Sequence, residues 1–320
     1  MNDLSLYRIL AFLPGAVRSA LNRLPSGTLE KISELRLRAG NITTVTLDGE
    51  NRYLTDAGIS ADAARCVRIS DADLDEFLYR LCGGSVYAYE ETVGRGFITR
   101  DGIRVGLFGR ITAQGGKMTG FSQITGANIR LPHHVSGCAA PLLTYITAHG
   151  FPDSGGILVI SPPGVGKTTL LRDLAIGLSR DIRTQSVNNG RFWRVCILDE
   201  RDEIYLPEYF SGCAADVLTG VSKAEGLECA ARVLSPEVII CDEIGSARDA
   251  AMISDAHFGG IAFMASMHGR ATSDALKHAA VKKLCDEGVF RYFYVLERKG
   301  CKVSGKLYEY ADGSVKQTLW

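Results

Sequence analysis

The chain has 320 residues, of which 46 % are hydrophobic and 22 % charged, with 36 basic and 36 acidic side chains. This length accommodates about two domains, and the composition is ordinary for a globular protein. The formal net charge of zero gives no bulk sign of nucleic-acid binding, although a local basic patch stays open.

The nine cysteines and the opening segment bear on the cellular compartment. No two cysteines have the C-x-x-C spacing, so neither a disulfide framework nor a zinc site is expected, as is typical of a reducing cytosol. The opening MNDLSLYRILAFLPG resembles an amphipathic helix more than a signal peptide. No apolar run approaches the roughly eighteen residues of a membrane span. We expect a soluble protein that is able to dock on a membrane complex.

The first part of the chain predicts a small α+β domain. Short helices are expected within residues 4–24, followed by strands at 42–47 and 52–54 that are joined by an Asp48-Gly49 turn. Residues 71–82 predict a helix that Asp71 caps. Its apolar stripe consists of Leu74, Phe77, Leu78 and Leu81.

A strand-rich stretch follows at 84–121, with turns at Asp101-Gly102 and around Gln114. Its arginines alternate with apolar residues, so several are expected on one polar face, either solvated or functional. We place the domain boundary near residue 137, which divides the chain into residues 1–137 and 138–320. From residue 157 onward strands and helices alternate, which predicts an α/β domain with a mainly parallel sheet.

The second domain opens with a phosphate-binding loop. Residues 157–178, ILVISPPGVGKTTLLRDLAIGL, place a buried strand, a glycine-bearing turn and an amphipathic helix in succession. Gly164 and Gly166 let backbone N–H groups point at a phosphate chain. Lys167 can reach the β- and γ-phosphates, and Thr168 can bind Mg²⁺. The expected ATP-binding residues are Ser161, Pro162, Pro163, Gly164, Val165, Gly166, Lys167, Thr168 and Thr169.

One position departs from the usual loop pattern, because Ser161 stands where the first Gly is common. Serine is small enough for the turn, so nucleotide binding is expected regardless.

A second motif supplies the groups that hydrolysis requires. The buried strand VIICDE ends in Asp242-Glu243. Asp242 is placed to hold Mg²⁺ in a Walker B arrangement, and Glu243 to polarise the attacking water. A strand that merely ends in solvated acids is the less favoured alternative.

Two further strands end in polar residues. VCILDE continues as RDE, so Asp199 and Glu203 are candidate metal ligands and Glu200 a candidate catalytic group. A surface role for these acids stays open. The strand in GGIAFMASMHGRA ends in His268. A histidine at a strand end is often structural, but beside the other motifs we favour its role as a sensor of the γ-phosphate. The carboxyl ends of parallel strands lie at one sheet edge, where ligands bind in α/β proteins.

The order of these motifs resembles the secretion and pilus-motor ATPase superfamily, where ILDERDEI and ASMHG correspond to the Asp and His boxes. Within it, the chain is similar to the family of stage III sporulation AA proteins, the ATPases of the sporulation channel in endospore-forming bacteria. Stretches that carry this resemblance include ISELRLRAG, YAYEETVGRGFITRDGIRVGLFGR, NIRLP and DVLTGVSKAEGLECAARVLSPEVIICDEIG. The strand end Asp242-Glu243 departs from the Gly-Glu common in pilus motors.

The resemblance implies a RecA-like P-loop NTPase domain behind an α+β interface domain, assembled into a ring, expected to be a hexamer, with ATP and Mg²⁺ between subunits. It further implies a cytoplasmic position in the mother cell, peripheral to membrane channel or export proteins of the sporulation apparatus. In the superfamily, arginines of the N-terminal domain reach the nucleotide, which makes Arg95, Arg104 and Arg110 catalytic candidates.

Two alternatives stay open. One is a nucleotide-binding assembly scaffold with little turnover, against which the presence of Glu243 and His268 argues. The other is a nucleic-acid translocase. Zero net charge and the lack of a strip of aromatic and basic residues argue against it, so nucleic acid is not an expected partner.

Overall fold

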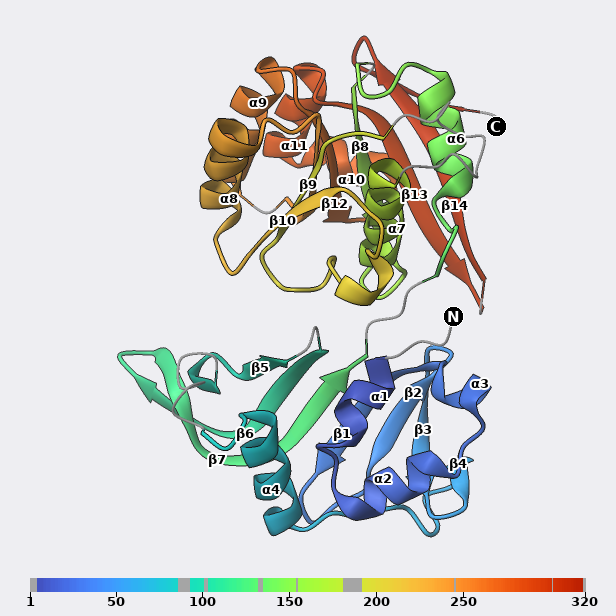
Figure 1. Ribbon diagram of the computed structural model, residues 1–320, viewed down its shortest axis with the longest axis vertical. Helices are drawn as coiled ribbons and strands as arrows, with labels where there is room; N and C mark the ends of the chain where they lie inside the picture. The colour runs from blue at the N-terminus through green and yellow to red at the C-terminus, as the bar shows by residue number, and fades with distance from the viewer. Residues whose placement is uncertain are drawn as a thin grey trace. The chain divides into compact units, whose positions relative to one another are not determined.

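The structure, a computed structural model, describes residues 5–85, 93–100, 103–131, 135–153, 155–180, 192–244, 246–300 and 302–318. The chain divides into two compact units, Met1–His133 and His134–Trp320, whose elements are labelled in Figure 1. We predicted the division near residue 137. Among the described residues no helix is long and apolar enough to cross a membrane.

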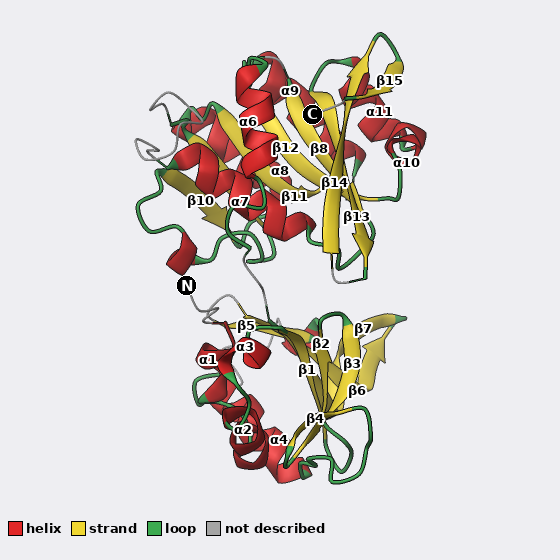
Figure 2. Cartoon of the chain, turned by 90° about the vertical axis from the view of Figure 1, so that its right-hand side faces the viewer, coloured by secondary structure: helices red, strands yellow, loops and turns green. Residues whose placement is uncertain are grey.

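The first unit is built on a seven-stranded sheet in the order β4-β3-β2-β1-β7-β6-β5, in which all neighbours are antiparallel. Its strands are β1 (Ile32–Arg38), β2 (Thr44–Leu47), β3 (Glu50–Thr55), β4 (Gly58–Ser60), β5 (Phe97–Arg100), β6 (Ile103–Gln114) and β7 (Lys117–Arg130). Its helices are α1 (Ser5–Leu10), α2 (Gly15–Asn22), α3 (Ser26–Leu29) and α4 (Asp71–Leu81). Figure 2 shows α1, α2 and α4 gathered on one face of this sheet.

Local sequence signals explain the hairpins of this unit. Asp48 and Gly49 both have positive φ, 51° and 84°, and join β2 to β3 with Leu47 paired to Glu50. This is the two-residue turn that an Asp-Gly pair favours. The tight β6–β7 turn at Gly115 follows the same logic, with φ of 58°. The predicted Asp101-Gly102 turn lies outside the described residues.

Helix α4 confirms the predicted apolar stripe, because Leu74, Phe77, Leu78 and Leu81 are all buried. The predicted cap was wrong. Ser70, one residue before Asp71, is the N-cap: its hydroxyl accepts a hydrogen bond from the Asp73 N–H at 3.1 Å, and the Asp73 carboxylate accepts one from the Ser70 N–H at 2.9 Å. This reciprocal pair satisfies two backbone donors at once, which a lone Asp71 cap would not achieve.

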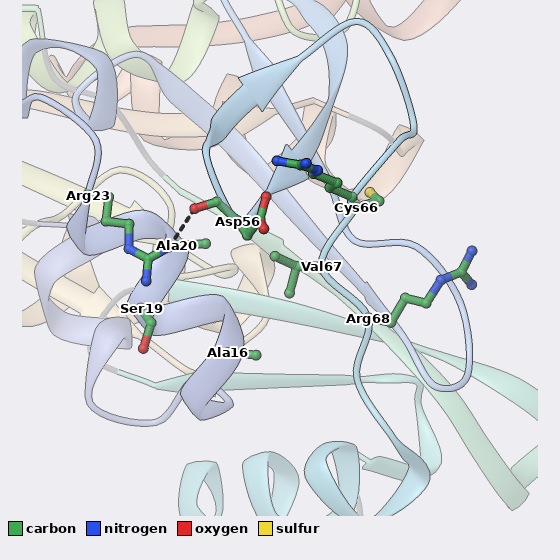
Figure 3. A pocket seen from close by; sticks show the side chains of 9 residues that line it. Ala16, Ser19, Ala20, Arg23, Asp56, Cys66, Val67 and Arg68 are labelled. Carbon is green, nitrogen blue, oxygen red and sulfur yellow. Dashed lines mark hydrogen bonds between the residues drawn. The ribbon is translucent and has the colours of Figure 1, made fainter.

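A cavity of about 460 Å³ lies in the first unit between α2 and residues 56–68 (Figure 3). The guanidinium of Arg23 donates to the main-chain carbonyl of Asp56 at its edge, at 2.6 Å. The described lining includes none of the residues to which the sequence assigned chemistry. The glycine-bearing loop and the polar strand ends that the sequence singled out belong to the second unit.

The second unit contains an eight-stranded sheet in the order β10-β9-β11-β12-β8-β13-β14-β15. Neighbours from β10 to β13 are parallel, whereas β14 and β15 are added antiparallel at one edge. The strands are β8 (Gly156–Ser161), β9 (Val195–Asp199), β10 (Ala215–Thr219), β11 (Val238–Glu243), β12 (Ala262–His268), β13 (Phe290–Lys299), β14 (Lys302–Ala311) and β15 (Ser314–Gln317). The fold is thus mixed α/β, with a parallel centre where the alternation of strands and helices predicted one.

Helices cover both faces of this sheet, as parallel strands require. They are α6 (Ala140–Ala148), α7 (Lys167–Ser179), α8 (Lys223–Cys229), α9 (Ala247–Phe258), α10 (Thr272–Lys277) and α11 (Ala279–Asp286), with short η2 (Pro207–Tyr209) and η3 (Ala230–Leu234). Side chains of a strand alternate between faces, so Ile157 and Val159 join the core under α6 and α7, while Leu158 and Ile160 join the core under α8, α9 and α11. Both faces are apolar, which explains why β8 reads as a continuous hydrophobic run.

Candidate nucleotide-binding site

Four parallel strands bring the predicted motifs to one edge of the sheet. β9, β11, β12 and β8 are consecutive neighbours, so their carboxyl ends lie together. The registers place His268 opposite Ser161 and Glu243 opposite Ser266. Lys167 and His268, 101 positions apart in sequence, are therefore in direct contact.

The loop after β8 has the backbone that its glycines allow. Gly164 and Gly166 adopt φ of +73° and +119°, values that would strain any residue with a Cβ. Ser161 has no such demand because it belongs to the strand. Its buried hydroxyl donates to the carbonyl of Pro162 at 2.9 Å. The structure thus gives the physical reason why serine fits where glycine is common.

Helix α7 begins directly behind this loop and presents a polar end to it. Its N-cap is Gly166, and no side chain caps the first turn. The N–H groups of that turn have no partner within the helix, and the helix dipole makes this end positive. Together with Lys167 and the hydroxyl of Thr168, this donor set fits the phosphates of a nucleotide.

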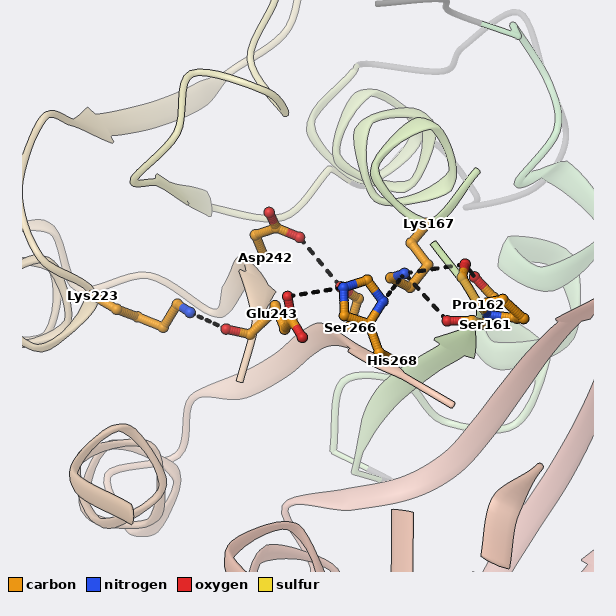
Figure 4. Close-up of polar contacts among 8 residues, drawn as sticks. All are labelled: Ser161, Pro162, Lys167, Lys223, Asp242, Glu243, Ser266 and His268. Atoms are coloured by element: carbon orange, nitrogen blue, oxygen red, sulfur yellow. Dashed lines mark hydrogen bonds and ion pairs between the residues drawn. The ribbon is translucent and has the colours of Figure 1, made fainter. Parts of the chain in front are cut away.

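The ammonium of Lys167 is buried, with 8 % of the residue exposed. Its Nζ donates to the carbonyl of Ser161 at 3.3 Å and lies 2.9 Å from Nδ1 of His268 (Figure 4). Burial lowers the pKa of Lys167, and the nearby charges of Glu243 and Asp242 oppose that shift. The lysine is therefore held by a main-chain carbonyl and a ring nitrogen, which charged phosphate oxygens can replace.

His268 connects this lysine to the second motif. Its Nε2 lies 3.3 Å from Oε2 of Glu243. Because an ammonium can only donate, Nδ1 must accept from Lys167, which leaves the ring proton on Nε2, directed at the carboxylate. Lys167, His268 and Glu243 form one chain of polar contacts that runs from the start of α7 to the ends of β12 and β11.

The neighbouring carboxylate is held differently. The hydroxyl of Ser266, fully buried on β12, donates to Oδ1 of Asp242 at 3.2 Å. Asp242 is half-buried. Its orientation is set by β12, the strand that also carries His268.

The acids after β9 lie differently from what the sequence led us to expect. Oδ1 of Asp199 accepts from the Glu203 N–H at 2.9 Å, and Oδ2 accepts from the N–H groups of residues 204 and 205 at 2.9 and 2.8 Å. Burial raises the pKa of Asp199 and these backbone hydrogen bonds lower it. The carboxylate closes a turn, so metal ligation by Asp199 stays a prediction that this geometry does not favour.

The buried Arg172 of α7 holds the same turn. Its Nε donates to the Ile204 carbonyl at 2.8 Å, and its guanidinium also donates to the carbonyl of Glu203. Glu200 is exposed. Within the described residues no three His, Cys, Asp or Glu side chains form a group that could hold a metal.

The three candidate arginines all belong to the first unit. Arg104 stacks over the ring of Phe97 at 4.3 Å, and Arg95 and Arg110 are exposed. Their assignment to the nucleotide remains a prediction.

Two basic residues near the site were missed. Arg298 of β13 donates to the Gly164 carbonyl at 3.1 Å. The buried Lys223 of α8 donates to the main-chain carbonyl of Glu243 (Figure 4). The available signal for Lys223 was its position shortly after β10, a strand whose carboxyl end lies at the same sheet edge.

Comparison with known proteins identifies relatives over nearly the whole chain. The family described as "Sporulation stage III, protein AA" matches residues 5–312. The chain is 34 % identical over 314 residues to "Stage III sporulation protein AA" of Bacillus subtilis (strain 168), which covers 96 % of each chain.

Solved structures of an ATPase and of a pilus retraction motor share the fold. The ATPase DotB of Legionella pneumophila has a TM-score of 0.57 at 14 % identity, covering 96 % of this chain and 80 % of its own. The pilus retraction motor PilT, solved with bound ADP, has a TM-score of 0.57 at 16 % identity, covering 88 % and 81 %. At such identities the likeness concerns the fold alone.

The turn after β9 can be tested with Asp199→Asn. We expect the free energy of unfolding to fall by about 1–3 kcal/mol, because an amide presents a donor to N–H groups that the carboxylate now satisfies. Hydrogen exchange should show faster exchange at the amides of residues 203–205. Glu200→Gln makes the same chemical change at an exposed neighbour and should change neither quantity. Unchanged exchange at the amides of residues 203–205 in Asp199→Asn would contradict the role of Asp199 in closing this turn.

The tautomer of His268 is a second test. In the nucleotide-free protein, ¹⁵N NMR of labelled histidines should show the proton on Nε2, with His268→Gln identifying the signal. Lys167→Met removes the donor to Nδ1 and should relax this preference. A proton found on Nδ1 would show that Lys167 does not donate to this ring.

Proposed function

The chain belongs to the family described as "Sporulation stage III, protein AA", as the sequence motifs indicated, and from this premise we propose that it is a ring-forming ATPase of the secretion type. The observation that carries the proposal is the contact chain from Lys167 through His268 to Glu243, which joins the phosphate-binding loop to a carboxylate. In an ATPase, this connection would transmit phosphate binding at the loop to the carboxylate that acts on the attacking water.

We propose that residues 161–169 bind ATP. The loop glycines and the uncapped first turn of α7 support this, since both present backbone N–H groups to an anion. Thr168 and Asp242 would hold Mg²⁺, which neutralises charge on the phosphates when bound. Asp199 acts in this proposal by shaping the turn beside the site, since its carboxylate accepts a hydrogen bond from the main-chain N–H of Glu203. Metal binding by the Glu203 carboxylate stays a prediction.

Binding of ATP changes the partners of Lys167. The ammonium exchanges the carbonyls of Ser161 and Pro162 for phosphate oxygens, because a charged acceptor makes the stronger hydrogen bond. This removes the donor to Nδ1, so the ring of His268 can turn its Nε2–H from the Glu243 carboxylate to an oxygen of the γ-phosphate. Phosphate arrival is thereby reported to Glu243.

Glu243 then orients the water that attacks the γ-phosphorus, and the bond from that phosphorus to the ADP oxygen breaks. Glu200, exposed after β9, is retained only as a secondary candidate for this water. Arg95, Arg104 or Arg110 would stabilise charge on the transferring phosphoryl group from an adjacent subunit. In this arrangement the first unit serves as the interface domain of a ring, expected to be a hexamer, of RecA-like domains.

The family membership suggests where in the cell the protein acts. We propose that the ring works on the cytoplasmic side of a membrane channel or export complex of the sporulation apparatus, in the mother cell. Hydrolysis would power transport through that channel or its assembly.

Hydrolysis is tested by Glu243→Gln. ATPase activity should fall by about 10²–10⁴-fold, the usual effect of losing a group that acts on the attacking nucleophile. ATP binding should remain, whereas Lys167→Ala should lose it. Glu228→Gln, an exposed glutamate on α8, is the matched control. An ATPase rate unaffected by Glu243→Gln would favour the assembly scaffold.

Assembly is tested by mass in solution. Glu243→Gln with ATP and Mg²⁺ should trap a species of about six times the 34.6 kDa of one chain, because bound ATP persists at the subunit interfaces. Wild type without nucleotide is the comparison. Monomers under every condition would contradict the ring.

A further inference from the structure

We propose that Lys223 is a positioning residue of the hydrolysis site: its buried ammonium holds the end of β11 through the main-chain carbonyl of Glu243, and so sets where the Glu243 carboxylate stands. This inference rests on the proposed function, and it concerns a residue to which the sequence analysis assigned no role. Four features of the second unit support it.

The end of β11 is paired on one side only. The ladder with β12 resumes at Glu243, opposite Ser266, after a register shift that follows Ile240, whereas the ladder with β9 runs only to Cys241. A main-chain carbonyl that is turned away from water needs a donor. At Glu243, β9 no longer supplies one.

Lys223 is that donor. It is the first residue of α8, only 8 % of it is exposed, and its Nζ donates to the Glu243 carbonyl. A buried ammonium is costly unless it is hydrogen-bonded, and a charged donor makes a stronger bond than a neutral one. The contact therefore fixes the lysine and the strand end together.

The strand end is held from two sides. Figure 4 shows Lys223 approaching the main chain of Glu243 from the side opposite to Lys167 and His268. His268 contacts the Glu243 side chain, and Lys223 contacts its backbone. The contact of His268 is linked to the phosphate-binding loop through Lys167. The contact of Lys223 involves no residue of that loop.

The residues around Lys223, Ser222–Gly226, fix the start of α8. Ser222 caps α8 by accepting from the Glu225 N–H at 3.3 Å, while the Glu225 carboxylate accepts from the Ser222 N–H at 3.2 Å. A Cβ on Gly226 would lie 3.2 Å from a methyl group of Leu198, so glycine lets α8 approach β9 closely. Ser222, Glu225 and Gly226 thus fix the start of α8, and with it the position of the Lys223 Nζ.

The test is Lys223→Met, which keeps the length of the side chain and removes the donor. We expect kcat for ATP to fall by about 10- to 100-fold, the effect of misplacing a catalytic group by about 1 Å. KM and the affinity for a non-hydrolysable ATP analogue should change by less than about threefold. Lys223→Arg restores a charged donor and should recover most of the rate. Lys277→Met, at an exposed lysine, controls for the lost charge.

A double-mutant cycle separates positioning from general stability. In a Glu243→Gln background, Lys223→Met should cost little further activity, because the lysine acts through that carboxylate. A structural role would lower Tm, weaken nucleotide binding and cost the same factor in both backgrounds, and would overturn the inference. Wild-type kcat in Lys223→Met would overturn it with the proposed function intact. A wild-type chain without ATPase activity would overturn both.

Discussion

Two buried ammonium groups constrain the edge of the second unit's sheet. Lys167 and Lys223 are each 8 % exposed, and a buried cation is tolerated only where acceptors surround it. The chain supplies those acceptors from strand ends: the carbonyl of Ser161 and the ring of His268 for one lysine, and the carbonyl of Glu243 for the other. The positions of three neighbouring strand ends are linked through these few contacts.

Helix α7 connects this edge to two neighbouring loops through buried polar side chains. Behind Lys167, the buried Arg172 donates to carbonyls of the turn after β9. Asp173 accepts hydrogen bonds from the N–H groups of Gly137 and Ala139 at 3.1 and 2.7 Å. The helix that carries Lys167 is thus attached to two loops distant in sequence. A binding loop on such a support is held in one geometry before its ligand arrives.

The similarity to known proteins identifies the family and the fold, whereas the contacts of individual side chains indicate the reaction. The family match covers nearly the whole chain, and the likeness to DotB and PilT identifies an ATPase fold. A fold by itself does not establish a reaction. The proposal of ATP hydrolysis therefore depends on the contacts of Lys167, His268 and Glu243, and on Ser266, whose hydroxyl orients Asp242.

Features encoded by neighbouring residues could be predicted from the sequence by itself. The glycine-bearing loop between β8 and α7, the Asp48-Gly49 turn and the strand that ends at Glu243 follow from local backbone and side-chain preferences. Only the tertiary structure decided that Asp199 closes a turn and that Lys223 holds the Glu243 backbone. Those hydrogen bonds depend on the order of strands in the sheet and on where each ladder ends, which local preferences do not specify. Parallel strands identify the edge where polar residues gather, but the partner of each residue is set by packing between distant segments.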